Sequence, residues 1–183
     1  MGRRYDERIP ILVMKNDVWE IVPKPEGKSV VSSKWIYKIK HVADGSIEKY
    51  KARFVARGFF QKDGIDYEET FAPVAWYTSI RAIVALASMM KWDLHQMGVK
   101  TYFRNGVIEE EVYIEQPREF EVEDKVTHVC KLMKALYGVK QAHRAWYGRI
   151  DSLLTSLGFR KSKADPNLYL KVMDNEPVIL FYI

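Results

Sequence analysis

Residues 34–57 read Lys34-Trp35-Ile36-Tyr37-Lys38-Ile39-Lys40, then His41-Val42-Ala43-Asp44-Gly45-Ser46, then Ile47-Glu48-Lys49-Tyr50-Lys51-Ala52-Arg53-Phe54-Val55-Ala56-Arg57. Two runs rich in β-branched and aromatic residues flank the turn signal Asp44-Gly45, and this order predicts an antiparallel hairpin. Because side chains alternate between the faces of a strand, the basic residues share one face of each predicted strand. They are Lys34, Lys38 and Lys40 on the first strand, and Lys49, Lys51, Arg53 and Arg57 on the second.

The predicted hairpin carries the whole excess charge of the chain. Residues 34–57 contain seven basic and two acidic side chains, a net charge of +5. The 183-residue chain has 29 basic and 24 acidic residues, which is also +5, so the remainder sums to zero. Two interpretations stay open for the basic face. It is either a solvated surface whose lysines protect a sheet edge, or a cradle for phosphate groups.

Length and composition are typical of one folded domain, or one lobe of a larger enzyme. Hydrophobic residues make up 48% and aromatic residues 13%, which excludes a disordered chain. The pI near 9.1 is compatible with a polyanionic partner. The single cysteine, Cys130, excludes an internal disulfide and is predicted to be a small buried residue. No signal peptide or membrane-spanning run is visible, so we expect an intracellular protein, in cytoplasm or nucleus, with no membrane partner.

The pattern on both sides of the hairpin predicts a mixed α and β chain. Residues 1–18 form an irregular lead-in, and residues 58–73 and 136–139 form loops. Alternating or short apolar runs predict the strands, and apolar residues at helical spacing predict the helices. The strands are predicted at 19–22, 94–103, 112–114, 129–132, 168–172 and 178–183, and the helices at 78–92 and 142–157.

A series of short stretches resembles the reverse transcriptase domain of Ty1/copia retrotransposon Pol polyproteins, in order and at the family's spacing. The resemblance covers residues 19–183 almost continuously. The stretches are 33–40, 50–58, 64–74, 94–106, 111–117, 136–142, 144–147, 157–159 and 165–169.

This resemblance implies an α+β fold made of the fingers and palm of a right-hand polymerase, with the thumb absent. The fingers would comprise about 19–75 and 105–140, and the palm about 76–104 and 141–183. The implied activity is that of an RNA-directed DNA polymerase. Its implied partners are an RNA or DNA template-primer and a dNTP, and its implied cofactor is Mg²⁺.

The resemblance also implies a nucleotide-binding set. The basic hairpin would hold the triphosphate, and the backbone of Thr101 and Tyr102 would donate to the same phosphates. Phe103 would be an aromatic gate under the sugar, although the pattern alone equally indicates a core aromatic residue. The full set is Lys51, Arg53, Arg57, Thr101, Tyr102, Phe103, Tyr137, Gly138 and Gln141.

Gly98 departs from the family at the position of a catalytic aspartate. Two-metal catalysis needs carboxylates that bridge the ions, and glycine has no side-chain oxygen. Asp93 lies five residues earlier, more than about 10 Å away along the predicted strand and on its opposite face. The other two carboxylates would follow residues 178–183, beyond Ile183.

No catalytic carboxylate is therefore expected to be intact, and the expectation of Mg²⁺ binding is weakened. Residues that are unusual for the family at other functional positions point the same way: Phe60, Tyr102, Arg104 and His143. We expect a reverse transcriptase domain that is inactive in this chain. Two alternatives stay open, a non-catalytic nucleic-acid-binding module and a non-functional remnant of a decayed element.

Overall fold

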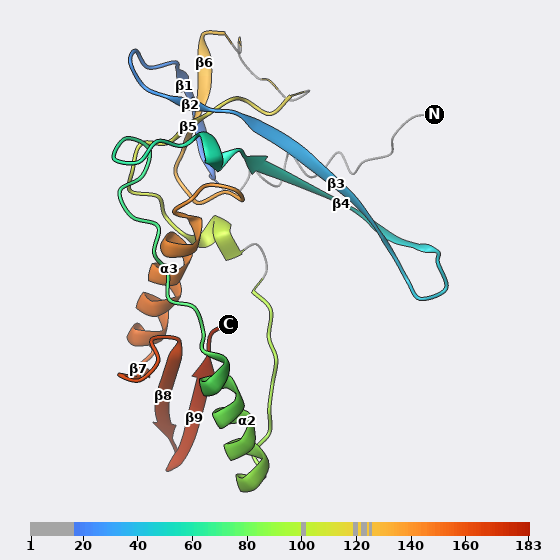
Figure 1. The fold of residues 1–183 in the computed structure, drawn as a ribbon, viewed down its shortest axis with the longest axis vertical. Helices are drawn as coiled ribbons and strands as arrows, with labels where there is room; N and C mark the ends of the chain where they lie inside the picture. Colours follow the sequence, from blue (N-terminus) through green and yellow to red (C-terminus); the bar gives the residue numbers. More distant parts are fainter. Residues whose placement is uncertain (1–16, 100–101, 119–120, 122–123, 125) are drawn as a thin grey trace. The chain divides into compact units, whose positions relative to one another are not determined.

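The computed structural model describes residues 17–99, 102–118, 121, 124 and 126–183. The chain divides into two compact units (Figure 1). The first comprises Met1–Thr70 with Tyr102–Trp146, and the second comprises Phe71–Thr101 with Tyr147–Ile183. Both helices and sheets are present, so the predicted mixed α+β class is confirmed. The assignment of these units to polymerase fingers and palm stays a prediction, as does the irregular lead-in, most of which lies outside the described residues.

A four-stranded sheet forms the core of the first unit, in the order β1-β6-β5-β2. Its strands are β1 (Trp19–Pro23), β6 (His128–Leu132), β5 (Tyr113–Ile114) and β2 (Val30–Val31). The pairs β1–β6 and β5–β6 are antiparallel, and β2–β5 is parallel. Cys130 lies fully buried in β6, and burial raises the pKa of its thiol to about 12. The predicted small buried cysteine is therefore confirmed.

The predicted hairpin is present as a two-stranded sheet of β3 (Ser33–His41) and β4 (Ile47–Ala56). Figure 1 shows it projecting from the four-stranded sheet. Residues 42–46 close its end, where the Val42 N–H donates to the Ser46 carbonyl over 3.0 Å. The Asp44 carboxylate accepts a hydrogen bond of 2.8 Å from the Ser46 N–H. The Asp44-Gly45 turn signal thus marks the turn correctly.

The strand predicted over residues 94–103 is wrong in the described part of that segment. Residues 92–99 have no regular structure, residues 100–101 lie outside the described residues, and Tyr102–Asn105 forms the 3₁₀ helix η2. A strand needs a neighbour for its hydrogen bonds, and none of the described strands pairs with this segment. Leu94, Met97 and Val99 are all more than half exposed, so the apolar residues there line no buried face. A second 3₁₀ helix, η1 (Gly58–Phe60), follows β4.

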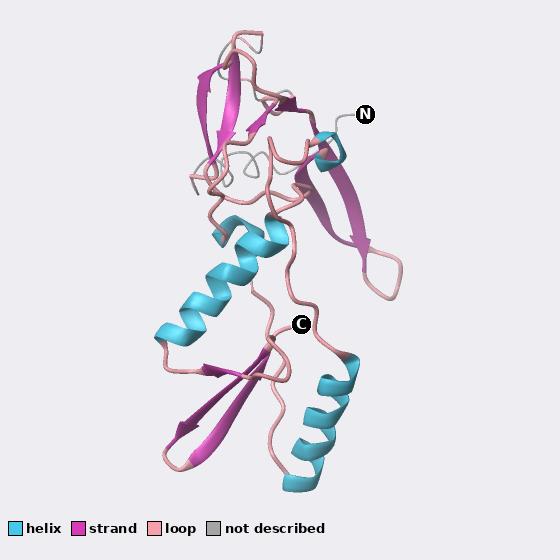
Figure 2. Ribbon diagram, turned by 60° about the vertical axis from the view of Figure 1, so that its left-hand side comes forward, coloured by secondary structure: helices cyan, strands magenta, loops and turns pink. Residues whose placement is uncertain are grey.

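The second unit contains helix α2 (Tyr77–Met90), most of helix α3 (Ala142–Ser156) and a three-stranded sheet (Figure 2). The sheet has the order β7 (Arg160–Lys161), β8 (Leu168–Met173) and β9 (Glu176–Phe181), all antiparallel. The two predicted helices and the two predicted C-terminal strands, β8 and β9, are confirmed within two residues, whereas β7 was not predicted. None of the described helices is long and apolar enough to cross a membrane.

A buried polar group fixes α3 to this sheet. Tyr169 of β8 is fully buried, and its hydroxyl donates a 2.7 Å hydrogen bond to the Asp151 carboxylate of α3. The same carboxylate accepts an ion pair of 2.8 Å from Lys161 of β7. A buried tyrosine hydroxyl without an acceptor is costly, so Asp151 is an essential part of this packing.

Candidate nucleic-acid interface

The register of the hairpin brings its two basic rows onto one face. Lys38 of β3 lies opposite Lys51 of β4, and Lys40 lies opposite Lys49. Residues directly opposite each other in an antiparallel pair project to the same side. Arg53 shares that side, opposite Ile36. We call the side chains of Lys38, Lys40, Lys49, Lys51 and Arg53 the basic face.

These like charges repel one another at Lys51. Repulsion from Arg53 is the largest cause that lowers the pKa of Lys51, followed by burial and then by the charges of Lys40, Lys49 and Lys38. One acidic side chain moderates the face, because Glu48 forms an ion pair of 3.0 Å with Lys49. The hydrogen bond and charge of Lys49 in turn lower the pKa of Glu48. The basic face is therefore a concentrated positive surface held on two strands.

An aromatic cluster adjoins the inner end of the hairpin. The Phe103 ring centroid lies 4.1 Å from that of Tyr102, 4.9 Å from Tyr137 and 4.8 Å from His143. Tyr102 also contacts Trp146 edge-on, with centroids 6.0 Å apart. Phe103 is 4% exposed and sits in η2, not on a strand. The packing accounts for its burial as a core aromatic residue, and its role as a sugar gate stays a prediction.

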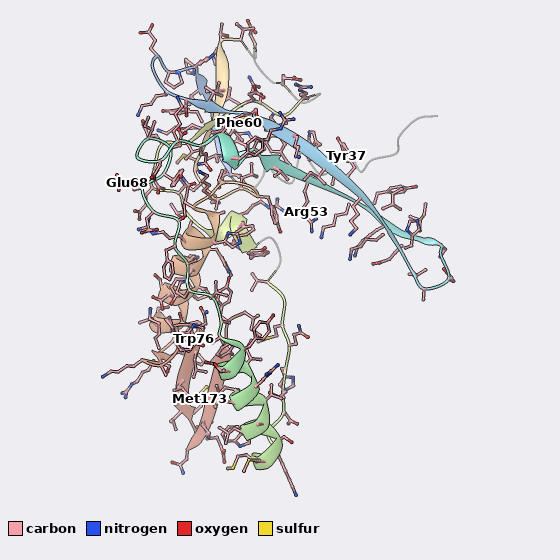
Figure 3. All side chains as sticks on the ribbon, in the orientation of Figure 1. Tyr37, Arg53, Phe60, Glu68, Trp76 and Met173 are labelled. Carbon is pink, nitrogen blue, oxygen red and sulfur yellow. The ribbon has the colours of Figure 1, made fainter. Side chains whose placement is uncertain are left out.

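Arg53 connects the basic face to this cluster. Its guanidinium carbon lies 5.6 Å from the centroid of the Tyr137 ring, within the range of a cation–π contact. The ring holds Arg53 at the inner end of the basic face, while the lysines extend toward the turn (Arg53 is labelled in Figure 3).

Gly138 permits a close approach between the 136–139 loop and the end of β4. It has a φ of +93°, and a Cβ added there would lie 2.0 Å from the Ala56 carbonyl oxygen. Next to it, the Ala56 N–H donates to the Tyr137 carbonyl over 2.8 Å. Only glycine tolerates both this φ and this contact. Gly138 therefore places Tyr137 against the hairpin.

Gln141 is 2% exposed and its amide is held by the protein. Its Oε1 accepts from Gln61 Nε2 over 3.0 Å, and its Nε2 donates to the Asp66 carbonyl over 3.0 Å. Gln61 Oε1 accepts in turn from the Lys140 N–H over 2.8 Å. This network joins the 58–73 loop to the start of α3. Sequence reasoning missed Gln61 because a buried glutamine in a polar loop leaves no periodic signal.

Eight of the nine residues predicted for nucleotide binding lie in the first unit, and Thr101 lies outside the described residues. Arg57 follows β4, where its N–H donates to the Ser32 carbonyl over 2.8 Å. Three of the eight, Lys51, Arg53 and Arg57, lie on or directly after the hairpin strands. Tyr102, Phe103 and Tyr137 share ring contacts, and Gly138 follows Tyr137 in the chain. Gln141 is bonded instead to Gln61 and to the Asp66 carbonyl.

Position 98 does not fit a two-metal centre. Gly98 lies in an irregular, exposed segment of the second unit, and it offers no side-chain oxygen. Among the described residues, no three His, Cys, Asp or Glu side chains gather where they could hold a metal ion. The described residues do not fit the Mg²⁺ pair that the family resemblance implies.

Comparison with known proteins decides the family. The profile of the family described as "Reverse transcriptase (RNA-dependent DNA polymerase)" matches residues 16–183. The chain belongs to this reverse transcriptase family. No solved structure matches the chain significantly.

Curated relatives of this reverse transcriptase domain are polyproteins of copia-type transposons. It is 44% identical to the Retrovirus-related Pol polyprotein from transposon TNT 1-94 of Nicotiana tabacum, over 93% of this chain and 13% of that protein. It is 42% identical to the corresponding polyprotein from transposon RE1 of Arabidopsis thaliana, over 85% of this chain and 11% of that protein. The Transposon Ty1-ER2 Gag-Pol polyprotein of Saccharomyces cerevisiae is 31% identical over 69% of this chain and 7% of its own length. The chain thus spans a small part of each relative.

Proposed function

We propose that this reverse transcriptase domain binds the phosphate backbone of nucleic acid through the basic face and that the chain does not itself add nucleotides. The observation that carries the proposal is the cross-strand register. Two lysine pairs, Lys38 with Lys51 and Lys40 with Lys49, stand directly opposite each other beside Arg53. The hairpin is therefore arranged to concentrate positive charge.

Repulsion within the basic face supports a polyanionic occupant. Like charges directly opposite in an antiparallel pair destabilise it, whereas an alternating arrangement of charges would not. A phosphate backbone would relieve this repulsion, because each contact neutralises a cation and releases a condensed counterion. A face that served only to keep an edge soluble would need fewer cations and no opposed lysine pairs.

The glycine at position 98 supports the absence of catalysis. The family resemblance implies an aspartate there, and a two-metal mechanism uses such a carboxylate to hold both ions near the reacting oxygens. Gly98 cannot supply it. Removing an essential metal ligand weakens the stabilisation of the transition state by several kcal/mol, on the order of a thousandfold or more in rate.

Two assays on the same protein test this proposal. Fluorescence anisotropy with a labelled RNA–DNA template-primer should show binding that weakens as salt rises. Primer extension with Mg²⁺ or Mn²⁺ should not exceed the rate of a tag-only control. Extension above that control would overturn the inactive assignment, and failure to bind the template-primer at low salt would favour a non-functional remnant.

Gly98→Asp serves as a matched variant in both assays. A Cβ added at Gly98 would have no atom within 4 Å, so the aspartate fits without displacing a neighbour. The variant should fold and bind nucleic acid as the parent does. It should also stay inactive, because one carboxylate does not complete a two-metal site among the described residues.

A further inference from the structure

We propose that Gln61 is a positioning residue for nucleic-acid binding, which acts through Tyr137 on Arg53 at the inner end of the basic face. This inference rests on the proposed backbone binding and names the group that fixes one of its contacts. The same hydrogen bonds assign Gln141 to the protein interior, although the family resemblance places it beside the nucleotide. Gln61 is 4% exposed and Gln141 is 2% exposed, so both amides lie inside the first unit.

Both ends of the Gln141 amide are bonded to protein. Its Oε1 accepts from Gln61 Nε2 over 3.0 Å, and its Nε2 donates to the Asp66 carbonyl over 3.0 Å. Burying an amide is costly unless such bonds are made, and in this protein they are made within the chain. Gln141 is therefore not placed to contact a nucleotide, and its contribution is to hold two loops together.

Gln61 also bonds the segment that follows Tyr137. Its Oε1 accepts from the Lys140 N–H over 2.8 Å, and its own N–H donates to the Gly58 carbonyl over 3.0 Å. Gly58 in turn packs against Gly138, since a Cβ added at Gly58 would lie 1.9 Å from the Gly138 carbonyl oxygen. These contacts fix the segment against η1 at two points.

Tyr137 transmits this constraint to the basic face. Its carbonyl accepts from the Ala56 N–H over 2.8 Å at the end of β4, and its ring lies 5.6 Å from the Arg53 guanidinium carbon. A cation held over a ring loses less freedom when it binds a phosphate, because part of its ordering is already complete. Loss of the Gln61 bonds should release the loop, and with it the ring that holds Arg53.

Gln61→Leu tests these contacts through affinity. It removes the partners of Gln141 Oε1 and of the Lys140 N–H without changing any charge. Fluorescence anisotropy with a labelled RNA–DNA template-primer should show affinity about two- to tenfold weaker than that of the parent. The slope of log K against log salt should stay that of the parent, because every basic side chain is still present.

Tyr137→Leu tests whether Gln61 acts through the Tyr137 ring. This variant should weaken binding by the same factor, and adding Gln61→Leu to it should weaken binding no further, because the ring is already absent. The Arg53 Nε–H signal in a nitrogen–proton NMR spectrum reports the contact without nucleic acid. The ring current of Tyr137 should displace this signal in the parent, and either substitution should remove the displacement.

Gln141→Glu adds a pH profile. A protonated glutamic acid can accept from Gln61 Nε2 and donate to the Asp66 carbonyl, as the glutamine does, whereas an ionised glutamate cannot donate. Burial and the neighbouring Asp66 carboxylate raise the pKa of such a carboxyl, against the opposing charge of Lys140. Relative to the parent at the same pH, the variant should bind normally at pH 5.5 and as weakly as Gln61→Leu at pH 8.

Gln116→Leu is the matched control for loss of a buried glutamine. Gln116 is also 4% exposed in the first unit, and its Nε2 donates to the His128 carbonyl of β6 over 3.1 Å. This variant should lower the melting temperature, as Gln61→Leu does, and should keep the affinity of the parent. Binding is measured below both melting transitions, and if Gln61→Leu does not fold, the pH profile of Gln141→Glu decides.

Three results would overturn the inference. Parental affinity and a parental Arg53 signal in Gln61→Leu would remove the positioning role and leave the proposed function standing. An equal loss of affinity in Gln116→Leu and Gln61→Leu would also remove it, because binding would then follow stability alone. Failure of the parent to bind the template-primer at low salt would remove the proposed function, and the positioning role with it.

Discussion

Lys38 and Lys51 stand directly opposite each other on the antiparallel strands β3 and β4. This relationship places two positive charges directly opposite each other on one face. The pKa of Lys51 is lowered by the charge of Arg53, then by burial, and then by the charges of Lys40, Lys49 and Lys38. The hairpin folds despite this repulsion.

Removing one of the opposed charges should stabilise the protein in the absence of nucleic acid. We expect Lys51→Gln to raise the free energy of unfolding by up to about 1 kcal/mol, because it removes repulsion from Arg53 and Lys38. Urea denaturation at low salt measures the gain, which should shrink as added salt screens the charges. Lys28→Gln is the matched control. It breaks the 3.1 Å ion pair with Glu111 and should not stabilise the protein.

The lowered pKa of Lys51 also determines how the stability of the protein changes with pH. The pKa of Lys51 is lower in the folded than in the unfolded state, so folding is penalised while the amine is charged. The penalty is absent above the ordinary lysine pKa, where the amine is neutral in both states. The stability gained there is lost as pH falls through the lowered pKa of Lys51 in the folded protein. The parent should therefore gain stability in alkaline solution relative to Lys51→Gln. An equal pH profile for the two proteins above pH 9 would contradict this assignment.

Gly138→Ala should destabilise the first unit more than Gly45→Ala. Both glycines have positive φ, +93° and +85°, and such backbone strain costs a non-glycine residue about 1–2 kcal/mol. At Gly45 an added Cβ has no atom within 4 Å, whereas at Gly138 it would lie 2.0 Å from the Ala56 carbonyl oxygen. The second substitution must also displace backbone. Similar unfolding free energies for the two variants would show that the 136–139 loop does not pack against β4 as described.

Asp151 should make the second unit sensitive to acid. Burial opposes its ionisation, but hydrogen bonds from Lys161 and Tyr169 outweigh burial and hold its pKa below the ordinary value. Its contribution to stability is therefore present above pH 3.8 and is lost as pH falls through the lower folded pKa.

Two substitutions at Asp151 separate the loss of the hydrogen-bond acceptor from the loss of the negative charge. Asp151→Ala leaves the buried Tyr169 hydroxyl without its acceptor and should cost about 1–3 kcal/mol at neutral pH. Asp151→Asn keeps an oxygen acceptor and should cost less. Urea denaturation of each variant at pH 7 and pH 3.5 measures both effects, and an alanine variant as stable as the parent at pH 7 would refute them.

Local patterns in the sequence were sufficient for the hairpin, both helices and most short strands. The hairpin combines an Asp-Gly turn with strict alternation, so its strands, turn and basic rows were all predictable. The register was not. Which residue of β4 stands opposite Lys38 depends on the exact residue at which the turn closes. In this hairpin the register shifts between Lys40 and His41, and His41 pairs with Ile47.

Features that depend on distant contacts were missed. Residues 94–99 have the composition of a strand, but pairing requires a neighbour that no local pattern specifies. Gln61 and Gln141 are 80 residues apart in sequence, and their buried hydrogen bond results from the packing of a loop on a helix. The aromatic cluster around Phe103 likewise joins η2, a loop and α3.

The salt dependence of nucleic-acid binding tests the central claim most directly. For duplex DNA the slope of log K against log salt is about −0.9 for each phosphate contact. The triple variant Lys38→Gln, Lys40→Gln and Lys51→Gln should therefore bind with a slope smaller in magnitude by about 2.7 than that of the parent. A control variant with the same loss of charge, Lys24→Gln, Lys62→Gln and Lys163→Gln, changes three exposed lysines that are not part of the hairpin strands and should keep the parent's slope. If the basic-face variant binds with the parent's slope and affinity at low salt, the opposed lysines do not hold phosphates and the proposed function is wrong.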